Sequence, residues 1–208
     1  MHLERFHWYG HDSFRIEDGA RQLYFDPWDI PASAPKADLI LVSHAHHDHY
    51  SPADIAALST STTCIVAPAD VAEKIGPAAQ AIRPGQTLQA AGFTVRAVPA
   101  YNVDKQFHPV GNQWVGYVVT LSDGMTVYHA GDADHVPEMD ALEGIDVALL
   151  PVSGTYVMTA EEALAAANAF RPRVVIPMHY GKIIGTEDDA RRFAKGYKGT
   201  TVIKQPEK

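Results

Sequence analysis

The sequence is poor in cysteine, and this shortage excludes a disulfide-stabilised fold. Cys64 is the one cysteine among 208 residues, so no internal disulfide can form, and nothing indicates an oxidising compartment. Cys64 begins the short apolar stretch of residues 64–67. We therefore expect Cys64 to be a buried thiol within a strand.

The sequence also lacks clusters of positive charge. Lysine and arginine total 17 against 25 aspartates and glutamates, which gives a formal net charge of -8, and the longest basic run is Arg191-Arg192. Affinity for nucleic acid depends on lysine and arginine contacts to the phosphate backbone. We expect no nucleic-acid partner, whereas a small anionic substrate remains compatible with this charge.

Long apolar runs are missing as well. Residues 1–5 lack the apolar centre of a signal peptide, and no stretch is long enough to cross a bilayer. We expect a cytoplasmic protein without a membrane partner. The length fits a single domain spanning residues 1–208, and a homo-oligomer remains open because no stretch identifies an interface.

Short strands and helices are interspersed along the chain. Predicted strands cover residues 6–9, 13–17, 22–25, 37–43, 93–98, 114–121, 126–129, 146–150, 174–176 and 200–203. Predicted helices follow Ser51, cover residues 69–75, follow the capping box at Thr159 and cover residues 187–195, where Gly196 should end the last one. The strong chemical motifs all follow predicted strands, where layered α/β folds commonly build their sites.

The histidine-rich segment of residues 44–49 is the main chemical signal. It follows the apolar run of residues 39–42 and offers four metal ligands within six positions, namely His44, His46, Asp48 and His49. Imidazole and carboxylate are the groups with which proteins bind Zn²⁺ and similar ions. In a compact loop His44 and His46 can face one ion while Asp48 and His49 face another. The alternative is a solvated histidine-rich turn.

Two distant segments complete the pattern. Asp132 ends the sequence His-Ala-Gly-Asp after the strand of residues 126–128, and His179 follows the strand of residues 174–176. A single histidine after a strand is more often structural. The three segments in this order strongly indicate a metal site.

With these motifs in place, the chain resembles the metallo-β-lactamase superfamily over nearly its whole length. The similarity begins at residues 10–14 (Gly-His-Asp-Ser-Phe), continues through Asp26-Pro27 and the histidine-rich segment, and ends with Asp132 and His179. The chain looks most like the small bacterial and archaeal hydrolases related to L-ascorbate-6-phosphate lactonase. The resemblance implies an α/β fold, a four-layer αββα sandwich with metals at one edge.

The resemblance also implies a ligand set and a cofactor. The implied metal ligands are His44, His46, Asp48, His49, Asp132 and His179. They would hold two divalent metal ions, with zinc as the first choice and manganese or iron as alternatives. Asp26 corresponds to an aspartate that accepts a hydrogen bond from a ligand histidine and fixes its tautomer.

One position departs from the family pattern. Asn102 stands where relatives with two complete sites carry another histidine. His108 could take that place, Asn102 could ligate weakly through its amide oxygen, or the first site could keep an extra water. We favour a weaker or empty first site with His44, His46 and Asp132, beside a complete second site.

The remaining candidates surround the expected metals. His11 either lines the site or caps a strand, and Tyr101, Lys105, Tyr156 and Tyr180 lie in loops that could bind a substrate. The function implied is hydrolysis of a small ester, lactone or phosphodiester by a metal-bound hydroxide held at Asp48 and Asp132. His108 or Lys105 would assist the leaving group or hold an anionic tail. The alternatives are a non-catalytic metal- or ligand-binding module and an RNA-processing nuclease, which the acidic charge disfavours.

Overall fold

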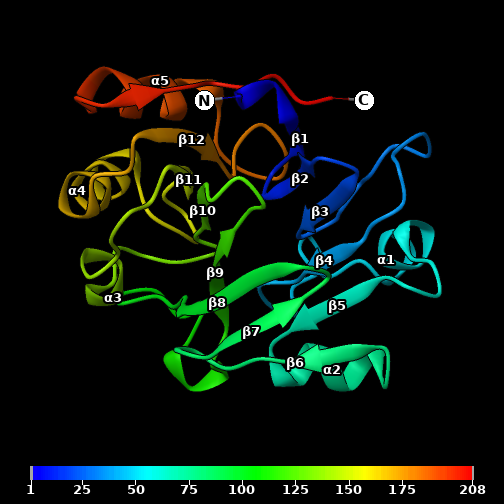
Figure 1. The fold of residues 1–208 in the computed structure, drawn as a ribbon. Coiled ribbons are helices and arrows are strands. Elements are labelled where there is room, and N and C mark those ends of the chain that lie inside the picture. Colours follow the sequence, from blue (N-terminus) through cyan, green and yellow to red (C-terminus); the bar gives the residue numbers. More distant parts are fainter. Residues whose placement is uncertain (1, 208) are drawn as a thin grey trace.

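Two β-sheets divide the chain between its N-terminal and C-terminal parts (Figure 1). The computed structural model describes residues 2–207. The first sheet contains six strands, in the order β1 (Phe6–Gly10), β2 (Ser13–Asp18), β3 (Arg21–Phe25), β4 (Leu39–Leu41), β5 (Cys64–Ala67) and β6 (Ala79–Ala81). The second contains seven, namely β7 (Thr87–Ala90), β8 (Phe93–Pro99), β9 (Val115–Thr120), β10 (Thr126–His129), β11 (Val147–Pro151), β12 (Val174–Met178) and β13 (Thr200–Thr201).

Both sheets change from antiparallel to parallel pairing along the chain. In the first sheet β1, β2 and β3 pair antiparallel, and β3 to β6 pair parallel. In the second sheet β7 to β10 pair antiparallel, and β10 to β13 pair parallel. The parallel strands β4 and β11 are buried throughout, as their continuous apolar sequences predict for strands covered on both faces.

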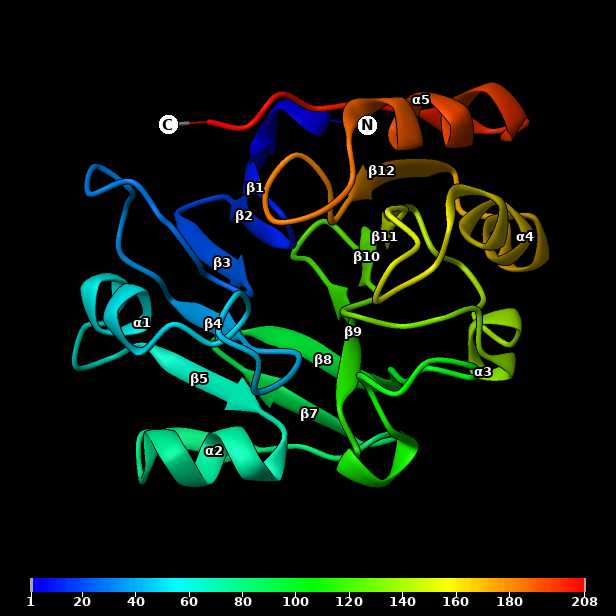
Figure 2. The ribbon, with the colours of Figure 1, turned by 180° about the vertical axis from the view of Figure 1, so that it is seen from behind.

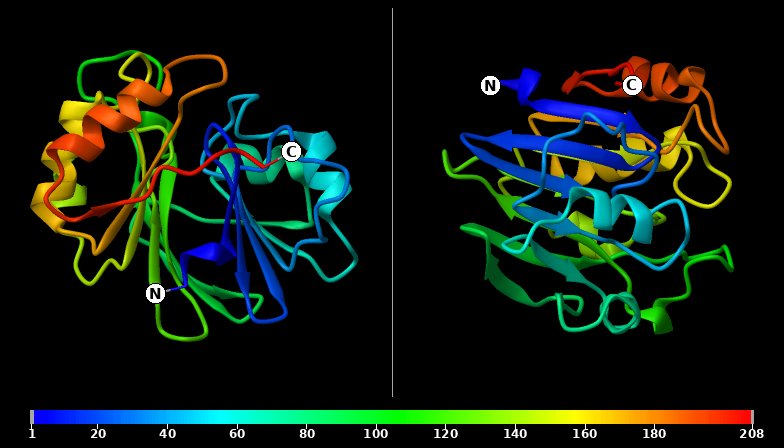
Figure 3. Two further views of the ribbon diagram at one scale, coloured as in Figure 1. Left: turned by 90° about the horizontal axis from the view of Figure 1, so that it is seen from above. Right: turned by 90° about the vertical axis from the view of Figure 1, so that its right-hand side faces the viewer.

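Helices cover the outer face of each sheet, which gives the four-layer αββα arrangement (Figure 3). The helices are α1 (Pro52–Leu58), α2 (Ala69–Ile75), α3 (Pro137–Asp140), α4 (Ala160–Phe170) and α5 (Glu187–Gly196), with 3-10 turns η1 (Leu3–Arg5) and η2 (Val110–Asn112). Figure 2 shows α1 and α2 beside the first sheet and α3, α4 and α5 beside the second. No helix within residues 2–207 has the length and apolarity needed to cross a bilayer.

Local sequence explains where the main helices begin. Ser51 Oγ accepts a hydrogen bond from Asp54 N at 3.3 Å, and Pro52 occupies the first turn of α1. At α4, Thr159 Oγ1 accepts from Glu162 N while Glu162 Oε2 accepts from Thr159 N, at 3.1 and 2.7 Å. This reciprocal capping box satisfies two backbone donors that the helix leaves free.

The predicted α/β sandwich is confirmed, with differences at exposed elements. Strands β6 and β7 and helix α3 were not predicted, and the last strand is shorter than expected. Gly196 lies inside α5 instead of ending it, since the helix closes at Tyr197. Cys64 is half-buried, because it is the first residue of β5 and lies at the sheet margin, so the expected buried thiol is wrong.

Hydrogen bonds join the two sheets at the edge where the parallel strands end. Val115 N donates to Ser43 O at 3.2 Å, and Tyr117 Oη donates to Val42 O at 2.7 Å, so β9 is bonded to the segment that follows β4. The carboxyl ends of β3, β4, β10, β11 and β12 lie at this edge. Their following loops carry the polar residues of the site.

Candidate metal centre

Three histidines form a first group at this edge. His44 and His46 follow β4, and His108 comes from the loop between β8 and β9. His44 Nε2 lies 3.0 Å from His46 Nδ1, and one ring nitrogen from each of the three histidines lies within 4.8 Å of the others. The Trp114 ring packs on all three, with centroid distances of 4.9, 4.9 and 5.7 Å.

A second group lies directly beside the first. It contains His11 from the β1–β2 turn, His49 from the histidine-rich segment and His179 from the end of β12, and all three are buried. His11 Nε2 lies 3.0 Å from Asp48 Oδ2. The backbone joins these elements as well, since His179 N donates to His11 O at 3.1 Å.

Asp132 connects the two groups. Its Oδ2 lies 3.2 Å from His108 Nε2 and 3.3 Å from His179 Nε2, and its Oδ1 lies 3.4 Å from His49 Nε2. His44 Nε2 is 3.9 Å from Oδ2. One buried carboxylate therefore faces ring nitrogens of both groups, which is the arrangement of a bridging ligand.

Neighbouring side chains fix the orientation of four of the rings by contacting their Nδ1 atoms. These contacts are His44 to Ser43 Oγ at 2.9 Å, His49 to Asp26 Oδ2 at 2.8 Å, His108 to Asn102 Oδ1 at 3.0 Å and His179 to Ser153 Oγ at 2.8 Å. Since Nδ1 is occupied in each ring, Nε2 faces the centre. His46 differs, because its Nδ1 is the atom that faces His44.

Asp26 occupies the position that the sequence indicated for it. Its carboxylate accepts from Ser43 N and Ser43 Oγ, each at 2.6 Å, in addition to His49. Asp26, His11 and His179 have positive φ angles of 41, 52 and 61°. Non-glycine residues in this conformation are uncommon and cluster at functional sites, where the surrounding structure holds them.

Asn102 holds His108 by hydrogen bonds, and the weak or empty first site stays a prediction. Asn102 Oδ1 accepts from His108 N as well as from its ring, and Asn102 Nδ2 donates to Asp134 Oδ1 and Tyr156 O. The loop after β8 folds back and brings His108 beside His44. Of the three alternatives for this position, the structure therefore supports the one in which His108 replaces the missing histidine. His108 is 1% exposed and directed at Asp132, which argues against the predicted leaving-group role.

A cavity of about 320 Å³ opens above the centre. Its lining residues are His46, His47, Asp48, Phe107, His108, Asp132, Tyr156 and Ile183. Tyr156 thus lies where a substrate-binding residue was expected. Phe107 and Ile183 were missed by the sequence prediction, because nothing in the sequence places these two loops side by side.

Three predicted substrate residues lie elsewhere. Tyr101 Oη contacts the exposed Glu138 at 3.1 Å, and Lys105 Nζ donates to Asp134 Oδ1 at 2.6 Å. Tyr180 is 4% exposed, and its ring packs on Trp8 at 4.9 Å. None of the three is among the residues that line the cavity, and their contact with substrate stays a prediction.

Burial controls the charge of the histidines. Burial lowers the pKa of His11 to about 4, holds the pKa of His44 well below its usual value, and together with His108 lowers the pKa of His46. Burial alone would raise the pKa of Asp132, but His179 and His49 hold it well below its usual range. Neutral His11, His44 and His46 beside an ionised carboxylate have the protonation states that metal ligands require. His49 differs, because burial lowers its pKa but Asp132 and Asp26 raise it well above its usual value.

Asp12 is a buried acid that the sequence analysis passed over. It is 0% exposed, and its Oδ2 lies 3.6 Å from His49 Nδ1. Burial and the neighbouring Asp132 raise its pKa well above the usual value. The available signal is a carboxylate directly after His11 in the Gly-His-Asp-Ser-Phe segment.

The donor set fits a divalent metal. Within residues 2–207, His49 Nε2, His108 Nε2 and Asp132 Oδ1 are buried without a hydrogen-bond partner. Leaving such atoms unpaired is costly. Imidazole nitrogens and carboxylate oxygens converging on one space satisfy zinc, manganese or iron.

Comparison with known proteins agrees with this geometry. Residues 5–179 match the family described as Beta-lactamase superfamily domain. A UPF0173 metal-dependent hydrolase of Thermococcus kodakarensis is 39% identical, with 95% of this chain and 94% of the relative covered. A similarly described protein of Nitratidesulfovibrio vulgaris is 33% identical, with 91% and 85% covered.

Solved structures of similar proteins have the same fold. The crystal structure of a Parabacteroides distasonis protein has a TM-score of 0.88 at 32% identity, covering 97% of this chain and 93% of the other. A metallo hydrolase from the archaeon Ignicoccus hospitalis has a TM-score of 0.79 at 26% identity, covering 98% of this chain and 95% of the other.

The chain belongs to the metallo-β-lactamase superfamily. Within it, the protein is an enzyme, a metal-dependent hydrolase. The closer relation to ascorbate-6-phosphate lactonases remains a prediction.

Proposed function

We propose that this hydrolase binds two adjacent divalent ions, with zinc as first choice, and cleaves a small ester, lactone or phosphodiester. His44, His46 and His108 would hold one ion, and Asp48, His49 and His179 the other. The observation that carries the proposal is the Asp132 carboxylate, which lies 3.2 to 3.4 Å from ring nitrogens of both groups. A divalent ion supplies a water of lowered pKa and polarises a carbonyl or phosphoryl oxygen.

Asp48 is the carboxylate that we assign, besides Asp132, to hold the metal and its water. It lines the cavity, and its Oδ2 is fixed by His11 Nε2 at 3.0 Å. Burial would raise the pKa of Asp48, but the hydrogen bond from His11 and the nearby His49 hold it below its usual range. The carboxylate is therefore ionised, which is the state that a metal ligand requires.

The test compares Asp132→Ala with His47→Ala, because His47 lines the same cavity but belongs to neither histidine group. Metal content is measured by mass spectrometry, and hydrolysis is measured on a panel of esters, lactones and phosphodiesters. We expect about two metals per chain in the parent protein and in His47→Ala. Asp132→Ala should lose metal and at least about a hundredfold in rate. Full metal content with full activity in Asp132→Ala would refute the proposal.

A further inference from the structure

Apolar side chains from separate loops surround the mouth of the cavity. Phe107 and Ile183 are 48% and 55% exposed, and they come from the loops after β8 and β12. Tyr156, from the loop after β11, meets the Phe107 ring edge-on with centroids 4.7 Å apart. Isolated exposed apolar residues need no explanation, but these three line one cavity together with Asp48 and Asp132.

The lining of this cavity also lacks a free positive charge. Within residues 2–207, the residues lining this cavity include no lysine or arginine. Lys105 is held by Asp134 at 2.6 Å and Asp104 at 3.1 Å, and Asp134 is 2% exposed. An anionic tail on the substrate would therefore meet no lysine or arginine among the residues that line this cavity.

Ile183 is held in an unfavourable backbone conformation. Its φ is 54°, which is rare for a β-branched residue, and Ile184 N donates to Lys182 O across it. Gly181 and Gly185 flank this tight turn with φ angles of 81 and 71°. Such a conformation persists only when the surroundings fix it.

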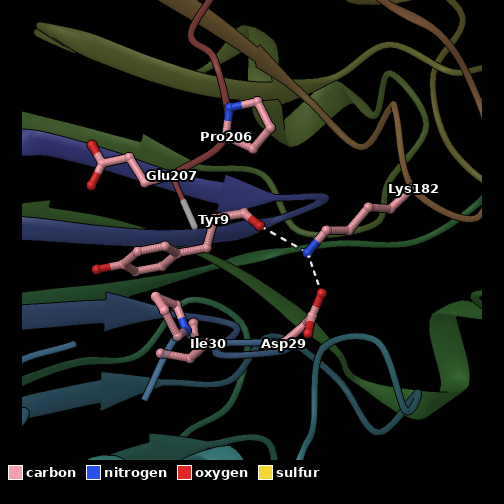
Figure 4. Close-up of a pocket in the computed structure, with 7 residues that line it drawn as sticks. Tyr9, Asp29, Ile30, Lys182, Pro206 and Glu207 are labelled. Atoms are coloured by element: carbon pink, nitrogen blue, oxygen red, sulfur yellow. Dashed lines mark hydrogen bonds and ion pairs between the residues drawn. The ribbon is translucent and has the colours of Figure 1, made fainter. Parts of the chain in front are cut away.

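The neighbouring Lys182 anchors this loop through contacts of its own side chain (Figure 4). Its Nζ donates to Tyr9 O at 2.9 Å and to Asp29 Oδ2 at 2.8 Å, and it lies 5.1 Å from the centre of the Trp28 ring. A Cβ at position 10 would lie 2.7 Å from Lys182 Cε, so Gly10 leaves the space that the lysine needs. Lys182 points into a neighbouring cavity of about 340 Å³, whereas Ile183 borders the one above the histidines.

We propose that the wall of Phe107, Tyr156 and Ile183 binds an uncharged apolar group of the substrate, and that Lys182 positions this wall by anchoring the loop of residues 181–185. The inference rests on the proposed function and narrows its substrate class. It favours esters or lactones with an acyl chain over substrates with an anionic tail. Lys182 acts through Ile183 and is a positioning residue.

The experiment measures calorimetrically the affinity of the zinc-loaded protein for alkyl hydroxamates from two to eight carbons. The hydroxamate group binds the metal, and the alkyl chain probes the wall. We expect affinity to rise about fourfold for each methylene that becomes buried. Phe107→Ala and Ile183→Asn should flatten this rise while leaving the two-carbon compound unaffected. Asn suits the test because it tolerates a positive φ.

Val110→Ala is the matched control, since Val110 follows Phe107 in the same loop, is 66% exposed and does not line the cavity. It should bind the whole series like the parent protein. Lys182→Met should weaken only the longer compounds, with zinc content unchanged, and should raise the KM of long-chain esters while leaving kcat for the acetyl ester unaltered.

Three outcomes would contradict these proposals, and they distinguish the apolar wall from the metal-dependent function. Equal affinity along the series in the parent protein, or equal flattening in Val110→Ala and Phe107→Ala, would overturn the apolar wall alone. Failure of every hydroxamate to bind the zinc-loaded protein would overturn the metal-dependent function proposed for the centre, and the wall with it.

Discussion

At the scale of single residues, the side chains that contact the Nδ1 atoms of the histidine rings are as important to the site as the rings themselves. Asn102 is the clearest case, because it holds both the backbone N and the ring of His108. Its own amide is fixed in turn by the buried Asp134 at 3.1 Å. Asn102, which stands where relatives carry a histidine, thus orients His108, the histidine that we expect to bind metal in its place.

Asn102→Ala should therefore weaken one metal site and leave the other. Without the Asn102 acceptor the His108 ring is free to turn, and loss of such a partner costs about 10- to 100-fold in metal affinity. Chelator titration should show one equivalent of metal released more easily. Tyr101→Phe serves as the control, because that hydroxyl contacts only the exposed Glu138. Unchanged release of both equivalents in Asn102→Ala would contradict this assignment.

At the scale of elements, the centre depends on how closely β9 approaches the end of β10. A Cβ at Gly116 would lie 2.6 Å from His129 O and 2.7 Å from Ala130 O. These carbonyls precede Gly131 and Asp132, so the approach sets the position of the bridging carboxylate.

Gly116→Ala should destabilise the fold and displace Asp132. Overpacking of this kind costs about 1–3 kcal/mol, which urea unfolding of the chelated protein would measure, and metal affinity should fall as well. Gly111→Ala is the control, since a Cβ there meets nothing within 4 Å and its φ is not positive. If Gly116→Ala were as stable as the parent protein, β9 and the end of β10 could move apart without loss of unfolding free energy, and this prediction would be wrong.

Elements with a local signal could be predicted from the sequence. The continuous apolar strands β4 and β11, the capped helices α1 and α4 and the histidine-rich segment after β4 all fall where the sequence indicates. Strand β7 is half exposed at a sheet edge, and α3 has four residues. Neither has the length or periodicity that a sequence pattern needs.

The residues of the site, like the elements, could be predicted from the sequence only where a local signal marks them. Ligands that directly follow a strand could be found, whereas His108 depends on a loop that folds back on itself and is held by Asn102. The pairing of Lys105 with Asp134, 29 positions away, also removes the one cation assigned to the substrate. Contacts of this kind depend on tertiary structure, which no local pattern records.

At the scale of the whole molecule, the centre joins the two sheets. His11 and the histidine-rich segment belong to loops of the first sheet, whereas His108, Asp132 and His179 belong to loops of the second. Metal bound by both sets should therefore stabilise the sandwich as a unit, since the unfolded chain does not offer such a site.

Chelation should lower the melting temperature by about 10 °C at pH 7.5. Metal at 1,000 times its Kd adds about 4 kcal/mol, and each kcal/mol shifts Tm by about 2–4 °C in a chain of this size. Differential scanning calorimetry with and without chelator measures the difference, and added zinc should restore it. Equal melting temperatures in the two conditions would exclude a metal shared between the sheets.

The pH dependence of the metal-free protein follows from its buried histidines. Burial lowers the folded-state pKa of His11 to about 4 and that of His44 well below its usual value, so below about pH 6.5 the unfolded chain binds more protons. Through these two histidines, stability should fall as the pH falls from 6.5 to 4. His49 acts in a different pH window, since burial lowers its pKa but Asp132 and Asp26 raise it well above its usual value. Its contribution to stability is complete below about pH 6.5 and is lost as the pH rises above that value. The metal-dependent difference in Tm should shrink as the pH falls below about 6.5, because protons compete for the ligands. A metal-free Tm that rises as the pH falls from 6.5 to 4 would contradict the assignment of neutral His11 and His44.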